Sequence, residues 1–260
     1  MAAATVDVLL PTSPEEAARA FGDGQGVTVV GGGTVVLPEI TYGRLKPARV
    51  VMLARAGLDR VTREGGVVTI GAAVPVAALE NGDEPLASAA RHLGDPEIRG
   101  QATVGGNLCA GPGGETPRGD LQAPLIALGA RARSVGAGGE RTEPIEDFLA
   151  GGAGRLVLDV SYDDVPRRAG YAAARRPHAH HYTILAVAAT RTGEELRVAA
   201  TGVGPCAVRL ASVERSGNAE DAVADVEPPD DALASAWYRT KILPRLVAQA
   251  LEQLGRAESG

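Results

Sequence analysis

The stretch TVGGNLCAGPGGETPRGD, residues 103–120, decides how the rest of the chain is interpreted. It is rich in glycine and contains two prolines, residues that break helices and strands, so we expect a loop here. A second glycine cluster lies in VVGGGTVVLP, residues 29–38, directly after a run typical of a short buried strand. Both clusters offer successive backbone N–H groups without obstructing side chains. Such arrays bind anions, phosphates above all, and two of them could hold one pyrophosphate from two sides.

The common nucleotide fingerprints do not match either cluster. The chain has no GxxxxGK[ST] sequence, and Gly31-Gly32-Gly33 lacks the third glycine of GxGxxG. For each cluster taken alone, the alternative to a phosphate site is an ordinary tight turn that binds no ligand. The glycine spacing by itself therefore predicts a phosphate-containing ligand and nothing more specific.

Composition excludes several classes of function. The net charge of −6 argues against nucleic acid as a partner, because a phosphate backbone requires a basic face. The two cysteines, Cys109 and Cys206, cannot ligate an iron–sulfur cluster or a four-cysteine zinc site. The N-terminal residues lack the basic segment of a signal peptide, and no apolar run reaches the ~18 residues of a membrane span. We expect a cytoplasmic protein with reduced thiols.

Hydrophobic patterning divides the chain into two lobes. In the first lobe we expect strands at residues 6–10, 27–30, 50–53, 67–70 and 155–161, and helices at residues 15–21, 76–80, 85–93 and 121–130. Ser13 is the expected N-cap of the first helix. In the second lobe we expect strands at residues 171–174, 183–191 and 195–201, a loop at 218–231, and a helical tail at 232–254 kinked at Pro244.

The motifs VGGGTVVLP, IRGQATVGGNL and DLQAPLIALGARARSVGAGGERTEPIEDFLAGG, in this order, resemble the flavoprotein (medium) subunit of the molybdenum hydroxylases, the xanthine dehydrogenase and carbon monoxide dehydrogenase family. YAAARRPHAHHYTILAVAAT resembles the small C-terminal domain of the same subunits. The resemblance implies an α+β protein. A two-lobed FAD-binding fold of the vanillyl-alcohol oxidase type would occupy residues 1–160, with subdomains at about 1–55 and 56–160. A small C-terminal domain of antiparallel sheet and helices would occupy residues 165–260.

The same resemblance implies a function. Members bind FAD and pass electrons from 2Fe-2S clusters on a small partner subunit to an external acceptor. The substrate is hydroxylated at a molybdopterin centre on a large partner subunit. The chain would then be an FAD-dependent oxidoreductase subunit without a catalytic acid or base of its own. The alternatives are a stand-alone FAD oxidoreductase with the same fold and a flavin-free assembly protein.

Carried over residue by residue, the resemblance also implies cofactor contacts. The residues expected to bind FAD in the two glycine segments are Gly31, Gly32, Gly33, Thr34, Val35, Thr103, Gly105, Gly106 and Asn107. All of these except Gly31 and Gly105 would meet the pyrophosphate. Asp120 would accept hydrogen bonds from sugar or ribityl hydroxyls, or it caps the helix that follows. Leu156 would be an apolar contact to the flavin. Tyr182 would cover the ring, unless it is an ordinary core tyrosine.

Three further features have more ordinary explanations. His178, His180 and His181 form a cluster, but no cysteine or carboxylate accompanies them, so we expect no metal site. Arg175 and Arg176 approach the FAD phosphates or a partner chain, or are simply solvated. No base is specified near Cys109, so we expect a structural thiol and not a nucleophile.

Overall fold

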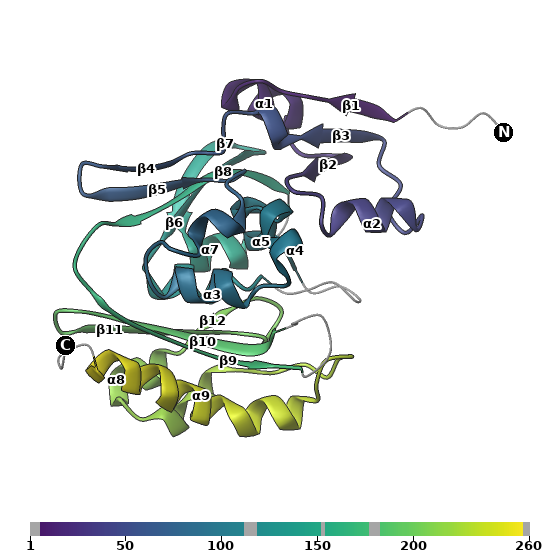
Figure 1. Cartoon of the computed structure of the whole chain (residues 1–260). Helices are drawn as coiled ribbons and strands as arrows, with labels where there is room; N and C mark the ends of the chain where they lie inside the picture. The colour runs from purple at the N-terminus through teal and green to yellow at the C-terminus, as the bar shows by residue number, and fades with distance from the viewer. Residues whose placement is uncertain (1–5, 112–118, 152–153, 177–182, 257–260) are drawn as a thin grey trace.

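A computed structural model describes residues 6–111, 119–151, 154–176 and 183–256. Within this part of the chain three sheets follow one another through the molecule (Figure 1). A small N-terminal sheet lies at one end and a C-terminal sheet at the other. The central sheet and a group of short helices lie between them. The expected α+β class with an antiparallel C-terminal sheet is confirmed.

The N-terminal sheet is parallel, with strand order β1-β3-β2. Its elements are β1 (Asp7–Leu9), α1 (Pro14–Phe21), β2 (Val27–Val30), α2 (Val36–Thr41), β3 (Arg49–Met52) and η1 (Leu53–Arg55). Ser13 caps α1 as expected, because its hydroxyl accepts from the Glu16 N–H at 3.2 Å. Helix α1 buries Ala17 and Phe21 against the sheet, whereas α2 buries none of its residues.

The central sheet is antiparallel, with strand order β4-β5-β8-β6-β7. Its strands are β4 (Val61–Glu64), β5 (Val67–Gly71), β6 (Arg131–Gly136), β7 (Gly139–Pro144) and β8 (Arg155–Asp163). The connection from β5 to β6 carries five helices in the described residues, η2 (Val76–Leu79), α3 (Leu86–His92), α4 (Pro96–Gln101), α5 (Val104–Leu108) and α6 (Gln122–Ala127). Helix α7 (Ile145–Ala150) follows the β6–β7 hairpin.

The C-terminal sheet is an antiparallel meander with strand order β12-β11-β10-β9. Its elements are β9 (Arg168–Arg175), β10 (Thr183–Thr192), β11 (Glu195–Thr201), β12 (Val208–Arg209), α8 (Ala211–Ser216), η3 (Ala219–Asp225) and α9 (Ala236–Arg256). One face packs on α9, through Leu185 and Val187 among others. The other face presents small residues such as Ala186 and Ala188 to the central core. Both faces are therefore buried, which explains the continuous apolar run of β10.

Several expectations need correction. Residues 104–108 of the glycine-rich stretch form helix α5, so this stretch is not a loop throughout. The N-cap position of α6 is Leu121, not Asp120. Part of the expected 218–231 loop is the 3-10 helix η3, and the helical tail expected from residue 232 begins at Ala236. In the described part of the chain, no helix is long and apolar enough to cross a membrane.

Candidate functional site

The glycine turn between β2 and α2 leaves backbone donors available. Gly33 has a positive φ of 77°, a conformation that favours glycine, and its carbonyl accepts from the Leu37 N–H at 3.1 Å. Among the described residues, the N–H groups of Gly32, Gly33 and Thr34 donate to no backbone or side-chain acceptor. These N–H groups could therefore donate to an anionic ligand.

The second glycine segment is built differently. Thr103 precedes α5 as its N-cap, and its hydroxyl oxygen accepts from the Gly106 N–H at 3.2 Å. The N–H groups of Val104 and Gly105 donate to the Val74 and Ala72 carbonyls at 3.0 and 2.9 Å. This segment therefore has few unused backbone donors. The Thr103 O–H hydrogen remains available, because the hydroxyl acts only as an acceptor toward Gly106.

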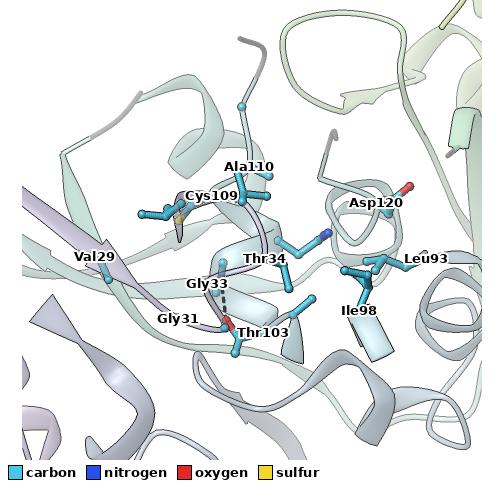
Figure 2. Close-up of a pocket in the computed structure, with 18 of the residues that line it drawn as sticks. Val29, Gly31, Gly33, Thr34, Leu93, Ile98, Thr103, Cys109, Ala110 and Asp120 are labelled. Atoms are coloured by element: carbon cyan, nitrogen blue, oxygen red, sulfur yellow. Dashed lines mark hydrogen bonds between the residues drawn. The ribbon is translucent and has the colours of Figure 1, made fainter. Parts of the chain in front are cut away.

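The two glycine segments pack directly against each other. A Cβ added to Gly31 would lie 2.4 Å from Thr103 Oγ1, and one added to Gly32 would lie 1.7 Å from the Gln101 carbonyl oxygen. Figure 2 shows Gly31 beside Thr103. Glycine is thus required here by the contact between two protein segments, in addition to any approach of a ligand.

These segments line one cavity of about 730 Å³. That volume is in the range of pockets that enclose a cofactor-sized molecule. Eleven of the twelve predicted contact residues line it: Gly31, Gly32, Gly33, Thr34, Val35, Thr103, Gly105, Gly106, Asn107, Asp120 and Leu156. Tyr182, the twelfth, lies outside the described residues. The tertiary structure therefore brings together residues that are up to 125 positions apart in the chain.

Asn107, and not Asp120, supports the start of α6. The Asn107 side chain accepts from the Leu121 N–H at 2.8 Å through Oδ1, so it satisfies the backbone at the start of α6. Asp120 is buried and lines the cavity. A buried carboxylate at a cavity wall can accept hydrogen bonds from the hydroxyls of a sugar.

The electrostatic effect of Asp120 extends to a neighbouring phenol. Burial raises the pKa of Tyr171, and the negative charge of Asp120 raises it further. Tyr171 therefore stays neutral at physiological pH. Its ring packs against His92, with the ring centroids 5.2 Å apart.

Gln122 does not line the cavity, but it supports the segment that does, and sequence reasoning missed it. It is 2% exposed, and its amide nitrogen donates to the Leu108 and Ala110 carbonyls at 2.8 and 3.1 Å. Its amide oxygen accepts from the Ala207 N–H at 3.0 Å. One side chain thus joins the end of α5 to the C-terminal part of the chain. The available signal was a polar residue inside the apolar run of residues 121–130.

Further wall residues lie outside the two glycine segments. They include Leu53 in η1, Leu93 directly after α3, Ile98 in α4, Ala102 directly after α4, Arg155 in β8, Thr183 in β10 and Leu233 before α9. Figure 2 shows Leu93 and Ile98 close to Asp120. Arg155 is already engaged, since its guanidinium donates to the Ser134 hydroxyl and to nearby carbonyls.

Of the other candidate residues that the structure describes, Cys109 lines the cavity, whereas Arg175 and Arg176 do not. His178, His180 and His181 lie outside the described residues. Arg175 is exposed, and Arg176 donates to the Ala232 carbonyl at 2.9 Å. Cys109 lines the cavity, and although the residue as a whole is exposed, burial raises its thiol pKa to about 12. Such a thiol is protonated at neutral pH and is a poor nucleophile.

Comparison with known proteins identifies the cofactor of this chain. A family model described as "FAD binding domain in molybdopterin dehydrogenase" matches residues 4–161. The chain belongs to this family. FAD is therefore its cofactor, and the cavity provides the chemistry that FAD needs: backbone N–H donors for phosphate and a buried carboxylate for hydroxyls.

Relatives of this FAD-binding chain cover nearly its whole length. The 6-hydroxypseudooxynicotine dehydrogenase complex subunit alpha of Paenarthrobacter nicotinovorans is 25% identical over 94% of this chain and 93% of its own. The carbon monoxide dehydrogenase medium chain of Hydrogenophaga pseudoflava is 26% identical over 93% and 94%. A chain of reconstituted CO dehydrogenase from Oligotropha carboxidovorans superposes with a TM-score of 0.84, at 23% identity over 98% and 99% of the two chains. At this level of identity, the match to the CO dehydrogenase chain shows that the two chains share a fold.

Proposed function

We propose that this chain is the FAD-binding electron-transfer subunit of a molybdopterin-dependent hydroxylase or dehydrogenase. The observation that carries the proposal is the cavity itself, in which the glycine turn after β2, the start of α5 and the buried Asp120 converge in a chain of the FAD-binding family. The names of the relatives support it, since they describe a medium chain and a subunit of a dehydrogenase complex.

The partners in this proposal are a molybdopterin-binding large subunit and a 2Fe-2S small subunit. When bound, FAD supplies the redox chemistry, and it delivers electrons to an external acceptor. The chain's own residues bind and orient the cofactor. Among the described cavity residues Asp120 is the buried carboxylate, and its place in the wall suits it to hold hydroxyl groups and not to shuttle a proton to the hydroxylated substrate.

The residue roles within this proposal follow the cavity walls. The N–H groups of the turn at Gly32–Thr34 and the Thr103 hydroxyl would hold the pyrophosphate, and Asp120 would hold sugar or ribityl hydroxyls. Leu156 would supply an apolar contact. We infer that residues 1–160 form the FAD-binding domain and residues 165–260 the C-terminal domain, in keeping with the separate C-terminal sheet. Cys109 and Cys206 are unpaired, which supports a cytoplasmic location.

Two measurements test the proposal. The purified full chain should show visible flavin absorbance bands, or acquire them on addition of FAD. Expressed in its native host, the chain should purify with an iron–sulfur subunit and a molybdopterin subunit, identified by mass spectrometry of the intact complex. Flavin bands without partner chains would indicate a stand-alone FAD oxidoreductase. No FAD binding at all would indicate a flavin-free assembly protein and would contradict the proposal.

A further inference from the structure

The C-terminal sheet contributes a polar group to the cavity that the sequence motifs do not indicate. Thr183, the first residue of β10, lines the cavity and is only 8% exposed. Its hydroxyl oxygen is buried, and among the described residues it has no hydrogen-bond partner. A buried hydroxyl without a partner costs free energy, unless a bound molecule supplies the missing hydrogen bond.

A β-bulge turns Thr183 toward the cavity. Thr183 pairs with Arg175 and Leu185 pairs with Ala174, so Ile184 is an extra residue in β10. Ile184 and Leu185 both pack in the core on the α9 side of the sheet, whereas strict alternation would place them on opposite faces. With strict alternation Thr183 would share the face of Leu185. The bulge reverses this and directs the hydroxyl to the cavity side.

The buried guanidinium of Arg239, in α9, holds this bulge in place. Its Nη1 donates to the carbonyls of Ile184 and Gly202, each at 2.7 Å. Gly202 has a φ of 80°, and a Cβ there would lie 2.3 Å from the Ile184 carbonyl oxygen, so only glycine permits this junction. Figure 1 shows α9 along the outer face of β9 and β10.

Arg239 also fixes the segment around Leu233, which, like Thr183, belongs to the C-terminal part of the chain. Its Nη2 donates to Asp231 Oδ1 at 2.7 Å, and the same oxygen accepts from the Leu233 N–H at 2.9 Å. Leu233 lines the cavity. One fully buried cation therefore positions both Thr183 and Leu233, although it does not line the cavity itself.

We propose that the Thr183 hydroxyl forms a hydrogen bond with the bound FAD, and that Arg239 is the positioning residue for this contact. The N-terminal sheet supplies the glycine turn at one wall of the cavity and the C-terminal sheet supplies Thr183 at another. An FAD molecule that reaches from the glycine turn to the C-terminal wall would place one of its two halves, flavin or adenosine, beside Thr183. This inference rests on FAD binding by the chain, as set out under the proposed function.

The deciding experiment compares two isosteric substitutions in the same strand, Thr183→Val and Thr190→Val, in the full chain. The Thr190 hydroxyl donates to the Ala127 carbonyl at 2.6 Å and lies outside the cavity. Thr183→Val should leave the apoprotein at least as stable as the wild type and weaken FAD binding roughly three- to tenfold. Thr190→Val should lower the melting temperature of the apoprotein and leave FAD affinity unchanged. Thr183→Ser, which keeps the hydroxyl, should retain most of the wild-type affinity.

The visible spectrum shows which half of FAD is contacted. A shift of the flavin bands in Thr183→Val places the hydrogen bond on the ring, and unshifted bands with weakened binding place it on the rest of the molecule. If the wild type binds FAD and Thr183→Val binds it equally well, the inference is wrong while the proposed function stands. If the wild type binds no FAD, the proposed function itself fails.

A double-mutant cycle tests the part played by Arg239. Arg239→Lys retains a cation but cannot reach all the carbonyl and carboxylate oxygens that the guanidinium contacts. In that background Thr183→Val should change FAD affinity by less than twofold, because the hydroxyl is already displaced. Additive losses of affinity would show that Arg239 does not act through Thr183.

Discussion

The backbone of Gly32 lies against the backbone of Gln101, so close that a methyl group on Gly32 would sit 1.7 Å from the Gln101 carbonyl oxygen. This contact joins the turn after β2 to the end of α4, and both segments line the cavity in which we propose that FAD binds. The shape of the cavity therefore depends on how closely the two glycine segments fit each other.

Gly32→Ala is expected to destabilise the protein by roughly 2–3 kcal/mol, because a carbonyl oxygen of the backbone must move to admit the methyl group. FAD affinity should fall in the same variant, since the turn is displaced. Urea unfolding and FAD titration measure the two effects. Gly100→Ala is the matched control, because a Cβ at Gly100, in α4, meets nothing within 4 Å and alanine favours a helix. Equal stability of the two variants would show that the contact is not tight.

Asn107→Ala is expected to cost about 1–2 kcal/mol of stability in the apoprotein, because the Leu121 N–H then loses its acceptor at the start of α6. Asn107→Asp keeps an acceptor oxygen and should recover much of the loss. Thermal unfolding without FAD isolates this structural effect from cofactor binding. A loss seen only in the presence of FAD would mean that the side chain serves the cofactor and not α6.

Asp120→Asn is expected to weaken FAD binding roughly tenfold, because an amide oxygen is a weaker acceptor for hydroxyls than a carboxylate. Equilibrium dialysis of the full chain with FAD measures the change. Asp23→Asn is the control, since Asp23 lies in an exposed turn where it accepts from the Gln25 N–H. Unchanged affinity in Asp120→Asn would remove this carboxylate from the proposed contacts.

His92 is expected to make stability depend on pH. Burial lowers its pKa, so the unfolded chain binds a proton more readily than the folded chain near pH 6. The stabilising contribution is present above the ordinary histidine pKa and is lost as the pH falls through the folded value. His92→Gln should therefore flatten the decline of the unfolding free energy between pH 7.5 and 5.5. Urea unfolding across this range measures how the unfolding free energy depends on pH. If this dependence is unchanged in His92→Gln, other titratable groups cause it.

Local signals predicted much of the fold correctly. The Ser13 cap, the strand at residues 27–30 and the C-terminal meander each depend on neighbours in the sequence, and each was found. Helix α4 was missed although Asp95 and Pro96 form a recognisable helix start, with the Asp95 carboxylate accepting from the Ile98 N–H. Helix α5 was not predictable from propensity, because glycines occupy two of its five positions and buried contacts with Ala72 and Val74 stabilise it.

The sequence by itself determined the family, because the motifs at residues 30–38 and 98–108 occur in the order and at the spacing typical of it. It also determined which residues belong to the glycine turn of the site. Only the tertiary structure decided that Asn107 and not Asp120 supports the start of α6, that Gln122 ties α5 to the C-terminal part, and that the bulge at Ile184 turns Thr183 into the cavity. These outcomes rest on contacts between residues 12 to 85 positions apart. Their energies arise when the sheets and helices pack, and no local pattern of residues encodes them.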